Sequence, residues 1–298
     1  MSGSALALVL IAAVCHATWN IAAKRVTSDG TVFVWCYATA SALLWLPIGV
    51  ILLARSPDPL SWSLLWAPVI SGLVHFAYGV SLQTGYDRAD LGVVYPVARG
   101  TGPLLTMIVA IAALSQRPGW AAVLGGLVVI GGVAVVATAS TRATADSAEH
   151  TAAISRGRRV AGLRWGALTG AVIATYTLFD DHSVTALGLG AVSYYSISAF
   201  WQAVTMSPVA WRRRDRVAPV VRAYWREVAV IALLSPFAYV LVLQAMKTTS
   251  VALVAPVRES SIVVGSLLAW WLFKEPRPVR RLLGAAIVVV GIALIAVG

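Results

Sequence analysis

Long apolar segments recur along the whole chain, and they constrain its fold more than any other feature. Each is close to the roughly 20 residues that a helix needs to cross the hydrocarbon core of a bilayer. The segments are too continuously apolar to be the alternating strands of a membrane barrel, and a helix in hydrocarbon satisfies its own backbone hydrogen bonds. We therefore predict an all-α integral membrane protein with ten transmembrane helices, in the segments 4–23, 31–53, 62–84, 91–114, 120–139, 163–180, 190–209, 227–246, 251–273 and 279–297.

The composition supports this interpretation. Of the 298 residues, 59% are hydrophobic and 12% are charged, unlike an ordinary soluble domain. The net charge is +11, but the basic residues fall in short loops, where they determine topology, so we expect no nucleic-acid partner. Cys15 and Cys36 lie within apolar segments, which favours small core residues over a disulfide or a metal pair. The segment 4–23 lacks the features of a cleaved signal peptide and is expected to be the first helix.

The two halves of the chain resemble each other. Several motifs recur at an offset of 160 or 161 residues: Tyr78-x4-Gln83 with Tyr239-x4-Gln244, Pro96 with Pro256, Pro118 with Pro278, and Gly131 with Gly291. We predict a first five-helix repeat over 1–140, a polar linker over 141–161 and a second five-helix repeat over 162–298. Because five is an odd number, the second repeat must lie inverted in the membrane, as in many secondary transporters, whose sites lie between the repeats.

The basic residues predict an orientation. Loops after odd-numbered segments hold 18 of the Lys and Arg residues, whereas loops after even-numbered segments hold 3. The positive-inside rule then places the odd-numbered loops in the cytoplasm and both termini outside. We expect a multi-pass protein of the bacterial inner (plasma) membrane.

Several motifs are similar to those of a known family: His16-Ala17-Thr18-Trp19-Asn20 with Lys24, Tyr95-Pro96-Val97-Ala98-Arg99-Gly100, the stretch 252–261, Lys274-Glu275-Pro276, and the stretch 284–291. Through them nearly the whole chain resembles the EamA-type family of the drug/metabolite transporter superfamily. The resemblance implies two inverted five-helix repeats around a central cavity, and export or uptake of small metabolites by alternating access. The superfamily handles amino acids, sugar phosphates, nucleotide sugars, organic cations and drugs, so the motifs leave the substrate open.

Three charged residues inside apolar segments are the strongest candidates for a binding site. Arg99 and Arg258 occupy near-equivalent places in the two halves, each two or three residues after a proline that weakens its helix. A charge inside a membrane helix costs about 2.5–3.5 kcal/mol, so such residues usually face a cavity, although an arginine near a helix end can snorkel instead. Glu259 is expected either to pair with Arg99 across the interface between the halves or to exchange protons.

Other candidates are polar or aromatic side chains that share a helix face: His16, Trp19, Asn20, His75, Tyr78, Tyr95, Tyr176, Tyr194, Trp201 and Tyr239. Helix packing or an interfacial belt is the alternative role for each of them. Asp180, Asp181 and His182 are expected in an exposed loop at the end of the sixth segment, and we predict neither a metal site nor catalytic residues. The glycines of 125–132 and 284–291 are expected to allow close helix packing.

These features predict a secondary-active transporter of a small polar metabolite or drug, with export the preferred direction. The two arginines against one glutamate favour an anionic or zwitterionic substrate. The expected partners are the lipid bilayer and this small molecule, with no cofactor except a proton through Glu259, and the sequence does not determine the oligomeric state.

Other functional classes remain alternatives. A lipid-linked sugar flippase of the same superfamily is the nearest rival function, and a channel is a further one. An integral-membrane enzyme is the main rival class, but neither a His-Glu-x2-His zinc pair nor a nucleophile with a matched base is found. An ATP-driven pump is disfavoured, since the sequence contains no Gly-x4-Gly-Lys-Ser/Thr phosphate loop.

Overall fold

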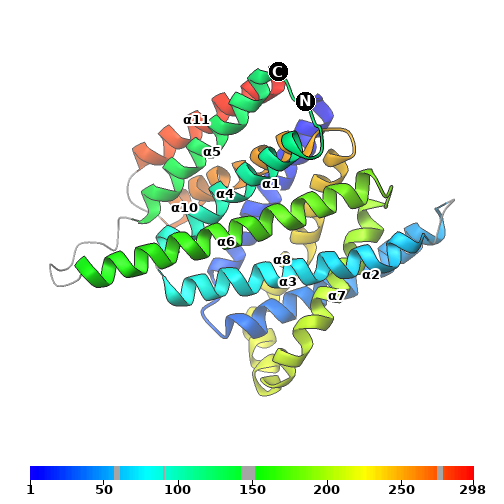
Figure 1. Cartoon of the computed structure of the whole chain (residues 1–298). Coiled ribbons are helices and arrows are strands. Elements are labelled where there is room, and N and C mark those ends of the chain that lie inside the picture. The colour runs from blue at the N-terminus through cyan, green and yellow to red at the C-terminus, as the bar shows by residue number, and fades with distance from the viewer. Residues whose placement is uncertain (57–60, 90, 142–151, 274–277) are drawn as a thin grey trace.

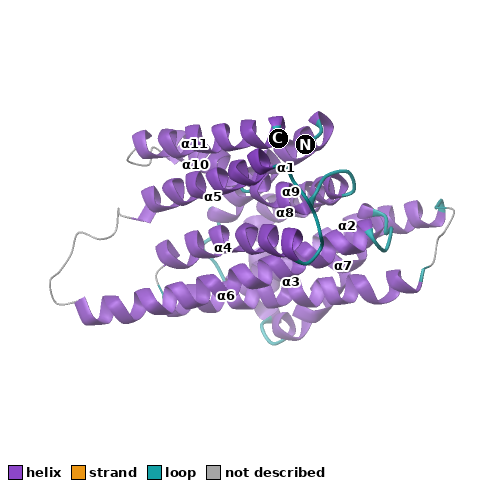
Figure 2. Ribbon diagram, turned by 45° about the horizontal axis from the view of Figure 1, so that its top comes forward, coloured by secondary structure: helices purple, strands orange, loops and turns teal. Residues whose placement is uncertain are grey.

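The computed structural model is a bundle of α-helices (Figures 1 and 2), with no strand in the residues that it describes, which are 1–56, 61–89, 91–141, 152–273 and 278–298. A short 3₁₀ turn, η3 (Arg214–Arg216), precedes α8. The helices are α1 (Gly3–Lys24), α2 (Gly30–Ala54), α3 (Trp62–Arg88), α4 (Leu91–Ala112), α5 (Trp120–Thr141), α6 (Ala152–Thr185), α7 (Ala191–Trp211), α8 (Val217–Met246), α9 (Val251–Arg258), α10 (Ser260–Phe273) and α11 (Pro278–Val297).

Many of these helices are apolar on their outer surface. Within the described ranges, five stretches are long and apolar enough to cross a membrane: Gly3–Ala23, Gly30–Ala54, Trp62–Arg88, Val93–Ala112 and Arg214–Met246. Large apolar side chains such as Leu43 (73% exposed) and Val289 (64% exposed) lie on the outside of the bundle. A soluble protein rarely exposes so many, whereas hydrocarbon solvates them well. The chain is therefore a membrane protein with multiple apolar helices.

Two helices begin earlier than predicted. Helix α6 starts at Ala152 and ends at Thr185, against the predicted 163–180, so the end of the predicted linker is helical. Alanine and arginine are good helix formers, which lets the helix extend into this polar sequence. Helix α8 starts at Val217 rather than at 227 and bends at Tyr224, whose backbone is not helical (φ −128°, ψ 27°). Residues 142–151 of the linker and the Lys274-Glu275-Pro276 motif lie outside the described residues.

The predicted segment 251–273 is not one helix but two. Helix α9 ends at Arg258, Glu259 follows it, and α10 begins at Ser260. Pro256 lacks an N–H group and its ring crowds the preceding turn, which weakens the helix here. The Glu259 N–H instead donates to the Pro256 carbonyl at 3.0 Å, a tighter i to i−3 bond. This break puts two adjacent charged residues, Arg258 and Glu259, at an interruption of the helix.

Helices of the first half (α1–α5) pack on helices of the second half (α6–α11) in matched sets. The first helix of each half packs against the third and fourth helices of the other, as α1 does on α8 and α10, and α6 on α3 and α4. The α5–α11 and α2–α7 pairs lie at opposite sides of the bundle (Figure 1). Helix α5 runs antiparallel to α11, because Gly125 lies against Gly291 while Gly132 lies against Gly284. The main contacts between the halves therefore recur when the two halves are exchanged.

The α1–α2 connection is tied to the α7–α8 connection by charge. Asp29 caps α2 by accepting from the Val32 N–H at 3.3 Å, and its carboxylate accepts from Arg213 at 2.9 Å and from Arg216 at 3.4 Å. Burial by itself raises the pKa of the Asp29 carboxyl, but these hydrogen bonds and the charges of both arginines outweigh it. The net result is a pKa below the ordinary value of 3.8.

This lowered pKa predicts a contribution to stability that depends on pH. A carboxyl whose folded-state pKa is lowered stabilises the fold above its unfolded pKa, and the contribution is lost as the pH falls through the folded value. Asparagine also caps helices well, so Asp29→Asn removes the charge and keeps the cap. Because about half or more of each arginine side chain is exposed, we expect Asp29→Asn to lower the free energy of unfolding by only about 0.5 kcal/mol at pH 7. Thermal unfolding should show this difference at pH 7 and a smaller one as the pH falls below 3.8, and a difference that is unchanged in acid would contradict the prediction.

Candidate functional site

A buried ion pair joins α4 to the break between α9 and α10. Arg99 Nη1 lies 3.4 Å from Glu259 Oε1, and the two side chains are 9% and 4% exposed. Arg99 Nη2 lies 3.3 Å from His16 Nε2 on α1. Since a guanidinium can only donate, His16 Nε2 must be the acceptor in this contact. The expected pairing of Glu259 with Arg99 between the halves is present. We call His16, Tyr95, Arg99 and Glu259 the arginine cluster, because Arg99 also lies over the Tyr95 ring at 5.5 Å.

Arg258 has a different environment, although it is the neighbour of Glu259 in sequence. Its guanidinium lies over the Tyr239 ring, 5.0 Å from the ring centre. Among the described residues, no carboxylate lies within salt-bridge distance of it. Adjacent residues on a helix point about 100° apart, which explains why Glu259 pairs with Arg99 and not with Arg258. Arg99 is thus neutralised by Glu259, whereas Arg258 lies over the Tyr239 ring.

Asp180 is a hub of hydrogen bonds inside the bundle. It is fully buried, and its carboxylate accepts from Ser71 Oγ at 2.7 Å, from the Tyr194 hydroxyl at 2.6 Å and from the Tyr239 hydroxyl at 2.5 Å. His75 Nε2 lies 3.9 Å from Asp180 Oδ2. These five residues, from α3, α6, α7 and α8, form what we call the aspartate cluster. Three hydroxyl donors replace much of the hydration that a buried carboxylate loses.

The prediction of an exposed loop at Asp180, Asp181 and His182 is therefore wrong. Helix α6 continues through all three residues to Thr185, and Asp180 and Asp181 are buried. Only His182 is exposed. A polar triplet after an apolar segment normally marks a helix end, but here the hydroxyls of three other helices solvate Asp180. In the described part of the chain, no group of three or more His, Cys, Asp or Glu side chains is placed to hold a metal ion.

Tyrosine rings connect the two clusters. Tyr176 stacks on His75 with ring centres 4.2 Å apart, and Tyr78 meets Tyr176 edge-on at 5.7 Å. Tyr239 lies edge-on to His75 at 5.5 Å and also contacts Asp180 and Arg258. The two clusters therefore adjoin at the helix break, where Arg258 and Glu259 are consecutive.

Four other predicted site residues have roles that the sequence does not reveal. Tyr194 is fully buried, and its hydroxyl already donates to Asp180. Asn20 donates to the His16 carbonyl one turn back in its own helix. Trp201 lies against Gly72, where α7 packs on α3. Trp19 packs edge-on against His16 at 4.8 Å, and its indole N–H is buried with no hydrogen-bond partner in the described structure.

The sequence analysis missed two functional candidates, Asp180 and Ser71. A signal for both existed in the spacing. Asp180 follows Tyr176 by four residues, and Ser71 precedes His75 by four, so each extends a helix face that was already singled out. The signal was weak because Asp180 lies at the predicted end of its segment and serine is common in membrane helices.

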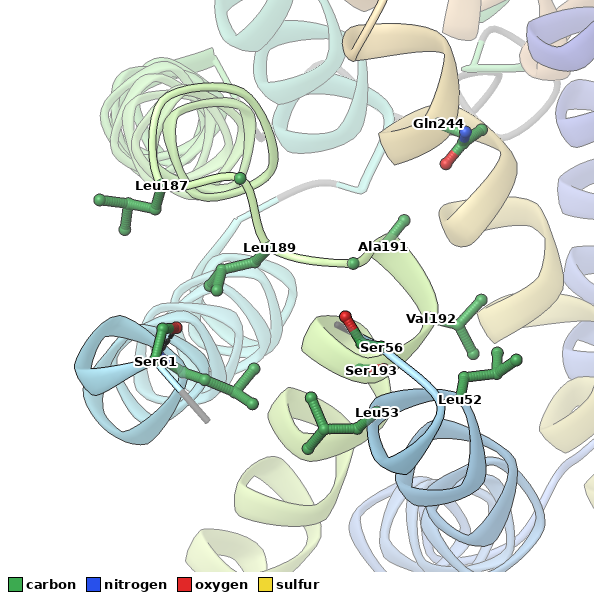
Figure 3. A pocket seen from close by; sticks show the side chains of 13 residues that line it. Leu52, Leu53, Ser56, Ser61, Leu187, Leu189, Ala191, Val192, Ser193 and Gln244 are labelled. Atoms are coloured by element: carbon green, nitrogen blue, oxygen red, sulfur yellow. Dashed lines mark hydrogen bonds between the residues drawn. The ribbon is translucent and has the colours of Figure 1, made fainter. Parts of the chain in front are cut away.

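A pocket of about 770 Å³ lies at the α6–α7 connection (Figure 3). It is formed by the end of α2, the start of α3, the α6–α7 connection, the start of α7 and the end of α8. None of the described residues that line it is charged. Two lining residues connect it with the cluster in sequence, because Ser193 precedes Tyr194 and Gln244 lies five residues after Tyr239. The pocket reaches the surface at the end of the bundle where α2 and α6 finish.

Known proteins resemble this chain in sequence and in fold. The model of the EamA-like transporter family matches residues 3–138 and again residues 160–297, which confirms the resemblance inferred from the motifs. None of the curated proteins matches the chain. A solved structure described only as "Crystal structure of protein" is 18% identical, covers 100% of this chain and 98% of its own, and has a TM-score of 0.78, so it is similar in fold alone. Because the family model matches both halves, the chain belongs to the EamA-like transporter family.

Proposed function

We propose that the protein is a secondary-active exporter of a small anionic or zwitterionic metabolite or drug in the bacterial inner membrane. Membership of a transporter family supports transport in general. We infer the substrate class from Arg258. Its guanidinium lies inside the bundle over an aromatic ring and has no carboxylate partner among the described residues.

The electrostatics favour an anion at Arg258. A cation in a low-dielectric interior is costly without a counterion, and a ligand carboxylate or phosphate can supply one with two parallel hydrogen bonds. Arg99 is a poorer anchor, since Glu259 already neutralises it. The Trp19 indole N–H adds a second donor, whose unpaired burial costs about 1–3 kcal/mol until an acceptor arrives.

The arrangement of the helices supports alternating access between two inverted repeats of five crossings each. The main contacts between the halves recur when the halves are exchanged, and α5 and α11, which end the two halves, run antiparallel. A broken helix at the interface of the repeats is typical of transporter binding sites. The α9–α10 break is a broken helix of this kind, and Glu259 at the break pairs with Arg99 of the first half.

The test is a thermal-unfolding screen of the detergent-purified protein with anions, zwitterions and cations. A ligand that binds only the folded state, at about 100 times its Kd, stabilises by about 2.7 kcal/mol. We expect anionic or zwitterionic ligands to stabilise, and Arg258→Gln to weaken their binding about tenfold, or about 1.4 kcal/mol. Arg226→Gln is the matched control, because Arg226 also lies over an aromatic ring, that of Trp225 at 5.4 Å, but is exposed.

Two results would contradict the proposal. One is stabilisation by cations alone. The other is an anion affinity that Arg258→Gln leaves unchanged. Proteoliposomes loaded with the stabilising ligand then test transport itself, and efflux that Arg258→Gln slows but Arg226→Gln does not would support export.

A further inference from the structure

We propose that His75 and Asp180 form a proton-binding site, whose loaded form is a His75 imidazolium paired with the Asp180 carboxylate. The inference that this proton is linked to the substrate rests on the proposed function, with an anion held at Arg258. The proton site itself stands on the geometry of the aspartate cluster.

Asp180 is placed as an ionised carboxylate. Ser71 Oγ and the Tyr194 hydroxyl both donate to Oδ1, and the Tyr239 hydroxyl donates to Oδ2. An ionised carboxylate is purely an acceptor, and it is the form that takes hydrogen bonds from three donors at once. Among the described residues, no Lys or Arg lies within salt-bridge distance of it. The buried negative charge thus has polar neighbours but no permanent counterion.

Both nitrogens of His75 face acceptors. Nδ1 lies 2.9 Å from the Ser71 carbonyl oxygen, which can only accept, so Nδ1 carries a hydrogen. A neutral imidazole then has a bare Nε2, and this nitrogen faces Asp180 Oδ2 at 3.9 Å. In the neutral ring, a lone pair of Nε2 faces a lone pair of Asp180 Oδ2. A second hydrogen on Nε2 turns this contact into an ion pair. The ring that would carry this positive charge stacks on Tyr176, whose π-face favours a cation. The His75 side chain is 16% exposed, which leaves a route for proton exchange.

Asp181, which is also buried on α6, is a second group that can take up a proton near neutral pH. Tyrosine hydroxyls ordinarily titrate at about pH 10. Asp181 points about 100° away from Asp180 on the same helix. Arg258 is a fixed cation on the far side of the Tyr239 ring. The titratable or charged groups around the pair are Tyr78 on α3, Tyr176 and Asp181 on α6, Tyr194 and Tyr195 on α7, Tyr239 on α8 and Arg258 on α9.

Charge balance links the proton to an anionic substrate. Arg99 and Glu259 form an ion pair, whereas Arg258 and Asp180 do not pair directly. The formal charges of these four residues sum to zero when His75 is neutral. An anion at Arg258 leaves one negative charge in excess, and a proton on His75 removes it. Tyr239 couples the two sites directly, because its hydroxyl donates to Asp180 while its ring lies under Arg258. Each ligand therefore strengthens binding of the other by the same factor, typically about 5–150-fold for coupled sites.

The test is an NMR titration of the ligand-free, full-length protein in detergent with labelled histidine side chains. His75→Gln assigns the resonance, and His182→Gln is the matched control, since His182 is exposed on α6. We expect His75 to become doubly protonated on acidification. In the Asp180→Asn variant, the same change in the His75 resonance should need a proton concentration at least tenfold higher. A His75 that stays singly protonated while His182 titrates overturns the proposal, as does a titration that Asp180→Asn leaves unchanged.

Two further measurements keep the test decisive if Asp180→Asn does not fold. In the unsubstituted protein, the labelled Asp180 carboxyl carbon should stay ionised while His75 gains its proton, and protonation of Asp180 instead overturns the proposal. The affinity for benzoate, used as a simple carboxylate probe, should fall as the pH rises, and His75→Gln should abolish this dependence. A benzoate affinity with the same pH dependence in both proteins refutes the coupling. An absence of benzoate binding beside a titrating His75 refutes the anion site and leaves the proton site supported.

Discussion

Replacing Glu259 by alanine is expected to lower the free energy of unfolding by about 3–5 kcal/mol, because it leaves Arg99 charged and buried without its counterion. The remaining contacts of Arg99 are His16 Nε2 and the Tyr95 ring, and neither is negatively charged. Equilibrium unfolding of the detergent-purified protein measures the loss. The size of this effect follows from burial, since an ion pair of exposed side chains contributes only about 0.2–1 kcal/mol.

A double variant separates the lost ion pair from the lost volume. Arg99→Met combined with Glu259→Leu replaces both charges by apolar groups, and such replacements of buried pairs are often neutral or stabilising. We expect the double variant to unfold later than Glu259→Ala alone. If the two variants are equally unstable, packing at the helix break, and not the unpaired charge, explains the effect.

The second large effect is expected where α5 packs on α11. A Cβ at Gly125 would lie 2.6 Å from the Gly291 carbonyl oxygen and 2.9 Å from the Ile295 amide nitrogen. Both are backbone atoms, so the two helices must separate to admit a methyl group. We expect Gly125→Ala to destabilise the protein by about 1–3 kcal/mol, as overpacking of well-packed cores does.

Gly131 provides the control on the same helix. A Cβ there meets nothing within 4 Å, so Gly131→Ala should be neutral or should stabilise by up to about 1 kcal/mol through the higher helix propensity of alanine. Thermal unfolding of the two variants side by side checks the prediction. Equal effects at both positions would mean that helix propensity, and not the close approach of α5 to α11, decides stability here.

Several parts of the fold and the site could be predicted because they depend on local sequence. The apolar segments follow from composition, and the similarity of the halves follows from motifs such as Tyr78-x4-Gln83. The pairing of Arg99 with Glu259 was among the alternatives, since a charge buried in a membrane needs an opposite one and few residues can supply it. The EamA motifs predicted the family, which the match to both halves confirms.

Other features could not be predicted, because they depend on residues distant in sequence. Pro256 marks a weak point in its helix, but the break falls at Glu259, where the side chain turns to Arg99. The difference between the two arginines is not visible in their similar motifs. Only the packing of α4 beside α9 neutralises Arg99 and leaves Arg258 over an aromatic ring.

By itself, the sequence determined that this chain is a helical membrane protein of two similar halves with charged residues near their interface. Hydrophobicity and motif spacing are local properties of the sequence, so they do not depend on which residues pack together in the fold. Only the tertiary structure decided that Asp180 lies inside the bundle and not in a loop. A carboxylate can be buried there because Ser71, Tyr194 and Tyr239 donate to it from three different helices, and those donors meet only when the helices pack.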